Sequence, residues 1–375
     1  MMKPLTLVAV AVLVSLAACS PAPPAANPDA AAASATTTPR PVDDDNVDDI
    51  IKAWGPRQVV AARQMMAAYG APQEATGEKL VWHRKGPYKR ITVTRVEDPH
   101  DFPKPHMDFL QHTIDYRIPS DKATALYAYD GSVTLDRTVG EMSARCDIEG
   151  HNILTLNLAH DIVTGKKDAK QARMAFGQIV GQDAKGENPA YVTALQFDPT
   201  AFDGSDADVS VMPGSPVRAM KADGTTMAAS GDAEVLGLVG AVNENEILAA
   251  VEAQKKKVSG PVMEYARMLH QEHGTNLEMA MMLAQKTAIT PIETAAVDAE
   301  RLKGATALAE LTALTGDDFE RKYIEAMVKG HTEVLQMIDT KLMGMAQHDA
   351  VKKHLTDTRA AVAGHLEKAK SLEKR

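Results

Sequence analysis

Four side chains that can ligate metals fall near the middle of successive amphipathic segments in the C-terminal part of this 375-residue chain. They are Glu246, His273, His331 and His365. Helical bundles build cofactor sites from inward side chains on facing helices. Neutral imidazoles with one carboxylate suit iron, zinc or copper, and geometry decides between these metals. The sequence therefore predicts a candidate metal centre in this region.

Five helices are expected to position these side chains. Apolar periodicity predicts helices over residues 232–258, 261–287, 295–314, 317–345 and 349–374. Their ends are marked by Ser259-Gly260-Pro261, by Pro291 and by Thr315-Gly316. Short turns make the first two helices antiparallel neighbours, and the last two likewise.

Helix geometry predicts the heights of the four side chains. Glu246 lies about 13 residues before the first turn and His273 about 14 after it, so at about 1.5 Å per residue they stand nearly level. His331 and His365 lie about 15 residues before and 18 after the turn between the last two helices, a mismatch of roughly one helical turn. Apolar residues at helical spacing flank both, which places them on or beside the inward stripe.

A metal-free interpretation of the same residues stays open. The histidines could bond to one another, to Glu246 or to Tyr323 in a polar layer of the core. Three further histidines of the region, His270, His348 and His354, are expected to face solvent.

Residues 46–200 predict an α+β domain. A helical segment over 46–69, interrupted near Gly55-Pro56, precedes β-leaning segments at 79–83, 90–96, 113–118, 132–138 and 141–146. Turns at Lys85-Gly86-Pro87 and Val139-Gly140 indicate two hairpins. Helices are expected over 149–164 and 169–180. This order favours one antiparallel sheet covered by helices.

A proline-dense segment of this domain, residues 98–108, holds a second set of candidate ligands. Its prolines predict a loop rather than a helix or a central strand. The spacing matches no established metal motif, so a rigid surface loop is the competing interpretation. The residues that offer nitrogen and oxygen donors are His100, Asp101, His106 and Asp108, with His112 just beyond.

The N-terminal residues predict export. Lys3 precedes a short apolar run that ends at Ala18, which is typical of a secretory signal and too short for a spanning helix of about 20 residues. Leu16-Ala17-Ala18-Cys19 resembles a bacterial lipobox. The resemblance implies a signal peptide over 1–18 and acylation of Cys19, and Ser20 after it implies delivery to the outer membrane. An ordinary signal peptide with a chance cysteine is the alternative.

Composition predicts the character of two further segments and argues against one class of partner. Residues 19–45, rich in Pro, Ala, Ser and Thr, predict a tether, and residues 201–231 predict an interdomain linker. The net charge of -9 argues against a nucleic-acid partner, which requires a basic footprint.

Cys146 has no partner for an internal disulfide if Cys19 is acylated. It is expected to be buried and inert, with metal binding or redox sensing as the alternatives. Nearby polar residues, which structural hydrogen bonding explains as well as catalysis does, are Arg145, Asp147, Asn152, Asn157, His160 and Asp161.

The C-terminal region resembles a known family. The matching residues are Glu246, Tyr265-Ala266-Arg267-Met268 leading into Glu272-His273, residues 319–327 leading to His331, and His365-Leu366. They look like the exported bacterial ferritin-like family known as domain of unknown function 4142, over nearly all of residues 232–375. The resemblance implies an all-α, ferritin-like four-helix bundle in the cell envelope and no established reaction. In that family Asp usually precedes the first histidine, whereas Glu272 stands here.

A di-iron centre is not expected. Ferritin-type sites use Glu-x-x-His pairs. The residues three before His270, His273, His331 and His365 are Arg267, His270, Val328 and Val362. A mononuclear, histidine-rich site fits these residues better than a carboxylate-bridged pair of irons.

The leading expectation is an outer-membrane lipoprotein that faces the periplasm and binds a transition metal for storage, sensing or protection, without catalytic residues. Its lipid anchor makes the membrane a partner, and the sequence identifies no protein partner. One alternative is a structural or interaction protein of the envelope that holds no metal. Another is a hydrolase or redox enzyme centred on the His/Asp segment of the first domain.

Overall fold

A computed structural model describes residues 44–202, 204–218 and 231–374. The chain divides into two compact units, residues 1–206 and 207–375. The predicted signal peptide, Cys19 and nearly all of the predicted tether lie outside the described residues. Within the described ranges, no helix combines the length and apolar character that a membrane span needs.

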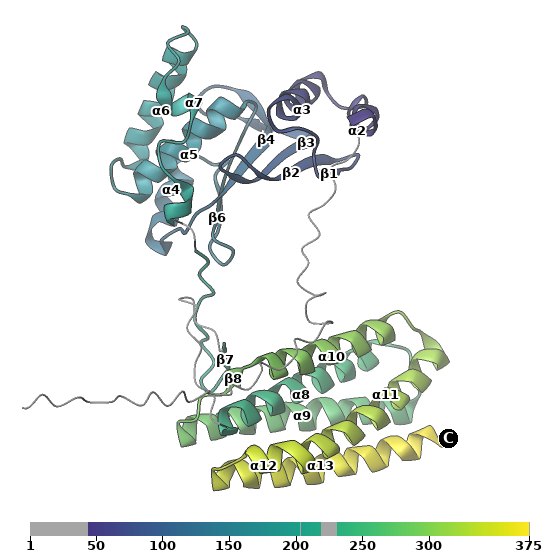
Figure 1. The fold of residues 1–375 in the computed structure, drawn as a ribbon. Helices are drawn as coiled ribbons and strands as arrows, with labels where there is room; N and C mark the ends of the chain where they lie inside the picture. Colours follow the sequence, from purple (N-terminus) through teal and green to yellow (C-terminus); the bar gives the residue numbers. More distant parts are fainter. Residues whose placement is uncertain (1–43, 203, 219–230, 375) are drawn as a thin grey trace, which may run out of the picture. The chain divides into compact units, whose positions relative to one another are not determined.

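The N-terminal unit contains a six-stranded antiparallel sheet with the strand order β1-β2-β3-β4-β6-β5 (Figure 1). The predicted antiparallel sheet with helices is confirmed. The strands are β1 (Glu74–Ala75), β2 (Lys79–Lys85), β3 (Tyr88–His100), β4 (His106–Asp115), β5 (Thr134–Asp136) and β6 (Glu141–Cys146).

Helices pack on this sheet, and α5 forms the centre of the core. Residues 152–162 of α5 are all buried, and they include the polar residues Asn152, Thr155, Asn157, His160 and Asp161. Its contacts include β4 and β6. The helices are α2 (Asp44–Ile51), α3 (Pro56–Tyr69), α4 (Ala123–Tyr129), α5 (Glu149–Val163), α6 (Ala169–Asp183) and α7 (Ala190–Thr193).

Residues 98–108 are mostly strand, so the predicted loop is wrong. Only residues 101–105 connect β3 to β4, and both strands are interior to the sheet. The register shifts between Val93 and Asp98, and such irregularities tolerate a proline that a regular central strand excludes. The paired residues beyond the shift are Asp98 with Asp108, Pro99 with Met107 and His100 with His106.

The C-terminal unit is helical, as predicted, and its long helices lie side by side (Figure 1). A π-helical turn over Ile338–Leu342 leads from α11 into α12. Outside the helices, β7 (Val217–Arg218) pairs in parallel with β8 (Ile292–Glu293). The helices are α8 (Gly231–Lys255), α9 (Gly260–Thr287), α10 (Ala295–Thr312), α11 (Gly316–Met337), α12 (Met343–Met345) and α13 (Asp349–Glu373).

Two apolar clusters fill the interior of this helical unit, and polar residues separate them. On α8 one cluster ends at Val242 and the other begins at Ala249. On α9 the change falls between Leu269 and Ala280, on α11 between Met327 and Val334, and on α13 between Val362 and Ala369. The four candidate ligands lie in these intervals, so the helices bring them to one polar layer.

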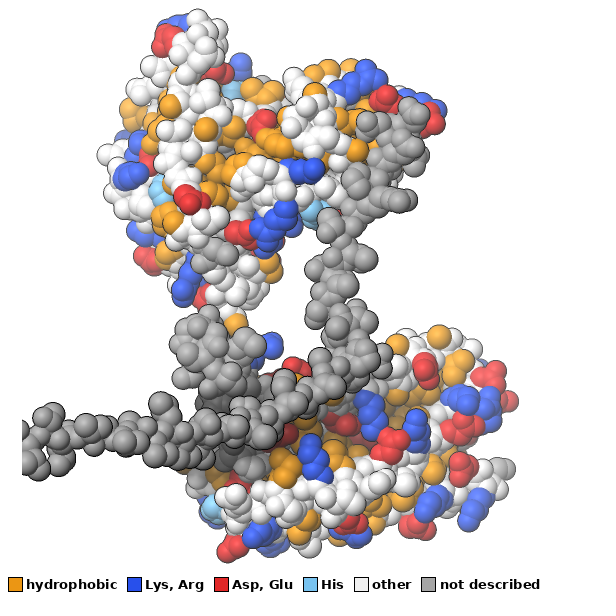
Figure 2. Space-filling view, viewed as in Figure 1, with side chains coloured by type: hydrophobic (Ala, Val, Ile, Leu, Met, Phe, Trp, Pro, Cys, Tyr) orange, Lys and Arg blue, Asp and Glu red, His pale blue; other side chains and the backbone are white. Residues whose placement is uncertain are grey.

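The surface of the helical unit is charged with both signs. On the face shown in Figure 2, Lys and Arg side chains alternate with Asp and Glu side chains. One such pair joins two helices, because Arg359 Nε of α13 lies 2.6 Å from Asp339 Oδ1. Exposed pairs of this kind add little stability each.

Candidate metal centre

His273 of α9, His331 of α11 and His365 of α13 lie together in the polar layer. One ring nitrogen of each lies within 4.8 Å of a ring nitrogen of each of the others. The ring centroids are 4.9 Å apart for His273 and His365, 5.4 Å for His331 and His365, and 5.9 Å for His273 and His331. None of the three residues is more than 4% exposed. Three helices thus direct their imidazoles into one buried space.

One nitrogen of each imidazole is held by an oxygen atom. His273 Nδ1 lies 2.8 Å from Asn243 Oδ1, His331 Nδ1 lies 2.7 Å from the Met327 carbonyl oxygen, and His365 Nε2 lies 2.8 Å from Glu272 Oε2. The amide of Asn243 is oriented by its own Nδ2, which donates to the Val239 carbonyl. Because all three partners are acceptors, each ring nitrogen that faces them must donate its hydrogen.

In the neutral form of each ring, the other nitrogen therefore carries a lone pair. These atoms are His273 Nε2, His331 Nε2 and His365 Nδ1. All are buried, and none has a hydrogen-bond partner within the described part of the chain. Buried polar atoms are rarely left in this state. A bound cation would satisfy all three lone pairs at once, and metal-bound histidines show this division of roles between their two nitrogens.

Glu246 of α8 approaches the centre from the side of His331. Its Oε2 lies 4.0 Å from His331 Nε2, and no hydrogen bond to this oxygen is formed among the described residues. Burial raises the pKa of the Glu246 carboxyl, and the neighbouring His331 opposes the shift. His273, which the sequence places level with Glu246, bonds to Asn243 instead. Glu246 thus lies beside His331, but it is not part of the group of three side chains whose ligand atoms all lie within 4.8 Å of one another.

Electrostatics favour the neutral imidazoles that metals bind. Burial lowers the pKa of His273 well below its ordinary value, and His365 and His331 lower it further. Burial also lowers the pKa of His365, although Glu272 opposes this shift. These two rings are therefore neutral at pH 7 and free of the proton that would compete with a metal ion.

A cavity of about 280 Å³ gives access to the centre between α9 and α13. Its lining extends from the exposed Asp357 to the buried His273 and His365. Asn276 and Thr358 face each other along it, with Asn276 Nδ2 donating to Thr358 Oγ1 at 2.9 Å. A small ion can therefore reach the imidazoles from the surface.

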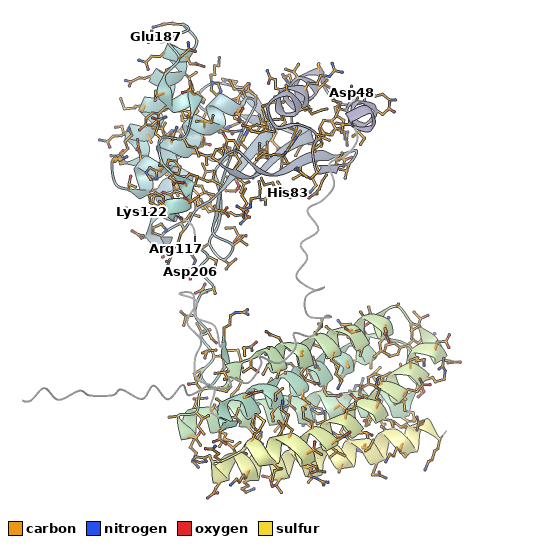
Figure 3. The ribbon with its side chains drawn as sticks, viewed as in Figure 1. Asp48, His83, Arg117, Lys122, Glu187 and Asp206 are labelled. Carbon is orange, nitrogen blue, oxygen red and sulfur yellow. The ribbon has the colours of Figure 1, made fainter. Side chains whose placement is uncertain are left out.

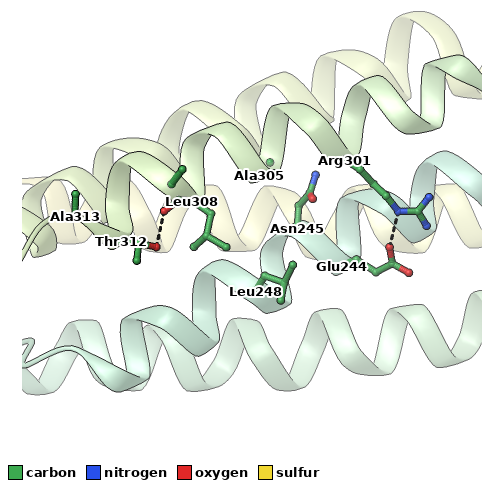
Figure 4. A pocket seen from close by; sticks show the side chains of 10 residues that line it. Glu244, Asn245, Leu248, Arg301, Ala305, Leu308, Thr312 and Ala313 are labelled. Carbon is green, nitrogen blue, oxygen red and sulfur yellow. Dashed lines mark hydrogen bonds and ion pairs between the residues drawn. The ribbon is translucent and has the colours of Figure 1, made fainter. Parts of the chain in front are cut away.

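A larger groove of about 730 Å³ lies between α8 and α10 and is not lined by the candidate ligands. Figure 4 shows Leu248 and Leu308 along it, and Arg301 whose Nε donates to Glu244 Oε2 at 2.9 Å. Its lining is mostly apolar and lacks a cluster of titratable groups. We therefore place the chemistry of this unit at the histidines.

The remaining histidines of the helical unit differ in exposure. His270 and His348 are exposed, as predicted; His270 accepts a bond from Gln254 Nε2 at 3.1 Å and His348 caps α13. His354 is only 6% exposed, so its predicted solvent exposure is wrong. It shares a face of α13 with Val351 and Thr358, at spacings of three and four residues, and that face is buried.

Some of the candidate metal ligands of the N-terminal unit also lie close together. Asp108 places Oδ2 3.3 Å from His100 Nδ1 and Oδ1 3.1 Å from His106 Nε2. Cys146 is buried, with Sγ 3.2 Å from the same His106 nitrogen. Burial raises the pKa of its thiol. Asp101 is exposed and lies outside this group.

Sequence reasoning missed two members of this second cluster. Asp147 appeared only as a polar neighbour, and His151 was not considered, yet both lie within 4 Å of Cys146 Sγ. The signal that could have identified them is the interval from Asp147 to His151, which is one helical turn at the start of α5. His83 of β2, labelled in Figure 3, lies elsewhere and pairs with Glu74 at 2.5 Å.

Other polar residues of the N-terminal unit have structural partners. Asn157 Nδ2 donates to the carbonyls of Tyr191 and Ala194 and so fixes α7 and its C-terminal end. His160 stacks on Phe197, with ring centroids 4.1 Å apart. Three more bonded residues are Asn152, whose Nδ2 lies 2.8 Å from the Leu110 carbonyl, His112, 3.0 Å from that same Nδ2, and Asp161, 2.6 Å from Lys167 Nζ.

Comparison with known proteins bears on the helical unit alone. Neither a curated protein nor a solved structure matches the chain. Residues 217–372 match the model of a family described as a domain of unknown function, DUF4142. The residues around Glu246, His273, His331 and His365 indicate the same resemblance. The match confirms that the C-terminal helical segment of the chain is similar to domain of unknown function 4142.

Proposed function

We propose that the helical unit binds one divalent transition-metal ion through His273, His331 and His365. The observation that carries this proposal is the set of three buried ring nitrogens without hydrogen-bond partners among the described residues, each on a ring whose other nitrogen is fixed by an oxygen. Ligating histidines almost always donate their second N–H to a carbonyl or carboxylate. The fourth coordination position of the metal remains for Glu246 or for water.

The donor set favours a single ion over a pair. Bridged di-iron centres need several carboxylates and Glu-x-x-His pairs. Here the layer offers three imidazoles and the one carboxylate of Glu246, while Glu272 is engaged with His365. Zinc, copper and iron all accept such ligands. Because three imidazoles and one carboxylate can together fill four coordination positions, as in closed sites, we assign the site to metal storage, sensing or protection rather than turnover.

The proposed scaffold is a ferritin-like four-helix bundle made of α8, α9, α11 and α13. Each of these helices contributes one of the four donors, Glu246, His273, His331 or His365. In this arrangement α10 is an additional helix that packs on α8. Such bundles hold metals between inward side chains of facing helices, which is the placement that the polar layer provides.

Metal content tests the site. The chain is purified without chelator, and the bound metal is measured in the His273→Ala/His331→Ala double variant and in His270→Ala. His270 lies three residues before His273 on α9 and is exposed, so it is a matched control. We expect the control to retain one more equivalent of metal than the double variant. Equal metal content in two folded variants would eliminate the site and leave the metal-free core as the explanation.

We further propose that Cys19 anchors the protein in the outer membrane, where it faces the periplasm. Support comes from the apolar leader and the Leu16-Ala17-Ala18-Cys19 sequence. A lipid anchor with more than one acyl chain binds a bilayer stably. In a Gram-negative host, the protein is expected in the membrane fraction with an acylated N-terminal cysteine by mass spectrometry, and Cys19→Ser is expected to abolish both results. An unmodified mature N-terminus in the unchanged chain would contradict the anchor.

A further inference from the structure

A second cluster of metal-ligating side chains lies where β4, β6 and α5 meet in the N-terminal unit. Cys146 Sγ is 3.2 Å from His106 Nε2, 3.3 Å from Asp147 Oδ1 and 3.7 Å from His151 Nδ1. Asp147 Oδ1 and His151 Nδ1 are 3.6 Å apart. His106, Cys146 and Asp147 each offer an atom within 4.8 Å of the others. One sulfur, two nitrogens and one oxygen are therefore gathered within contact distance.

These distances suit ligands around one tetrahedral ion. Zinc binds sulfur at about 2.3 Å and nitrogen or oxygen at about 2.0–2.2 Å, which separates neighbouring ligand atoms by roughly 3.3–3.7 Å. The separations measured around Cys146 Sγ and between Asp147 and His151 span 3.2–3.7 Å. His106, Cys146 and Asp147 form the group whose ligand atoms all lie within 4.8 Å of one another, so binding of the ion requires His151 to close on that group.

The orientation of His106 also suits a ligand. Its Nδ1 lies 2.9 Å from the Lys104 carbonyl oxygen, which can only accept, so this nitrogen carries the hydrogen. In the neutral ring Nε2 then holds the lone pair, and it faces Cys146 Sγ. A backbone carbonyl that fixes the far nitrogen is a recurrent support of metal-bound histidine.

Asp108 supplies an independent indication of a cation. It is 2% exposed, and its Oδ1 has no hydrogen-bond partner in the part of the chain that the structure describes. This oxygen lies 3.1 Å from His106 Nε2, without the geometry of a hydrogen bond. Asp108 lies at ion-pair distance from His100 and His106, yet a buried carboxylate oxygen that accepts no hydrogen bond is costly. Positive charge held at Nε2 of His106 and the Cys146 sulfur would offset that cost.

We propose that His106, Cys146, Asp147 and His151 hold a zinc ion that joins β4, β6 and α5, with Asp108 as an outer carboxylate. Four protein donors close the coordination sphere, which is typical of a structural site rather than a catalytic one. Cys146 is 3% exposed, which disfavours a role of its thiol as a nucleophile. The ion stabilises the sheet and the first turn of α5, and this site is independent of the histidines of the helical unit.

Cobalt(II) is the probe, because only a bound thiolate gives a sulfur-to-cobalt charge-transfer band in the near ultraviolet. The chain has two cysteines, so the full-length Cys19→Ser chain leaves Cys146 as the sole thiol. After removal of metal, we expect one equivalent of cobalt to produce this band and zinc to displace it. The imidazoles of the helical unit cannot produce it, so this result and the proposed function can fail separately.

Variants decide the assignment. Adding Cys146→Ser is expected to abolish the band, whereas Asp101→Asn, an exposed carboxylate of the same segment, is expected to leave it unchanged. Should the serine variant fail to fold, His151→Ala is used instead, and a loss of about 100-fold or more in cobalt affinity is expected. No band in the folded Cys19→Ser chain, a band that survives Cys146→Ser, or unchanged affinity in His151→Ala would overturn the proposal.

Discussion

His331→Ala is expected to weaken zinc binding at the helical unit by about 100- to 1000-fold. Structural zinc sites with four ligands bind with roughly 10–16 kcal/mol, which is about 2.5–4 kcal/mol for each ligand. His331 is 1% exposed and supplies one of the three ring nitrogens that lack a hydrogen-bond partner among the described residues, so its loss removes a buried ligand. Competition with a chromophoric chelator, in chains that also carry Cys146→Ser, measures this affinity alone.

A variant of a residue that holds a ligand in place without binding the metal shows whether the large effect of His331→Ala is specific to a ligand. Asn243 holds His273 through a 2.8 Å bond between its Oδ1 and His273 Nδ1, so that oxygen is already engaged by the ring. Loss of such an outer partner typically costs 10–100-fold in affinity, so Asn243→Ala should fall between His331→Ala and the exposed control His270→Ala. Zinc affinity that is equal in folded His331→Ala and His270→Ala proteins would show that His331 is not a ligand.

Much of the helical unit could be predicted because its signals are local. Ser259-Gly260-Pro261 ends one helix and begins the next, and the structure has α8 ending at Lys255 and α9 beginning at Gly260. Heights along the helices follow from the rise per residue, which is why residues as distant in sequence as His273 and His365 could be expected in one layer. In the structure, the two apolar clusters lie on either side of this shared layer and so define it.

Rotation about each helix axis was harder to predict. Asn243 and Glu246 are three residues apart on the same face of α8, and both stand nearly level with His273. Only the packing of α8 against α9 and α11 decides that Asn243 meets His273 while Glu246 approaches His331. The same limit explains His354, whose burial depends on how far the apolar face of α13 extends around the helix.

In the N-terminal unit, the sequence did not reveal which strand segments pair with each other. Prolines disfavour a central strand locally, but β2 pairs with β3 only as far as Thr94 and β6 pairs with β4 only from Leu110. Beyond the register shift near Val93, residues 98–100 and 106–108 therefore pair with each other in a two-stranded extension, where Pro99 has a partner strand on one side. The second cluster arises from this pairing and from the start of α5, which bring His106 and His151 beside Cys146. No spacing in the sequence encodes that contact between residues 106 and 146.

Acidification is expected to destabilise the metal-free helical unit by about 2–3 kcal/mol per pH unit below pH 6.5. Burial lowers the pKa of His273, His365 and His354 in the folded state, whereas the unfolded chain takes up protons near pH 6.5. The unfolded state thus binds more protons in this range, and each histidine removes up to about 1.4 kcal/mol of stability per pH unit. Glu246 acts oppositely: because burial raises the pKa of its carboxyl, protonation of the folded state offsets part of this loss as the pH falls.

Urea unfolding in the presence of chelator at pH 7.0 and 5.5 measures this dependence. Both tryptophans of the chain, Trp54 and Trp82, belong to the N-terminal unit, so far-ultraviolet circular dichroism combined with tryptophan fluorescence separates the two transitions. A His273→Asn variant should lose about one histidine's share of the slope, because its side chain cannot be protonated in the unfolded state. Stability of the helical unit that stays constant or rises on acidification would mean that its buried histidines are protonated when folded, and such imidazolium rings would repel a metal ion rather than bind it.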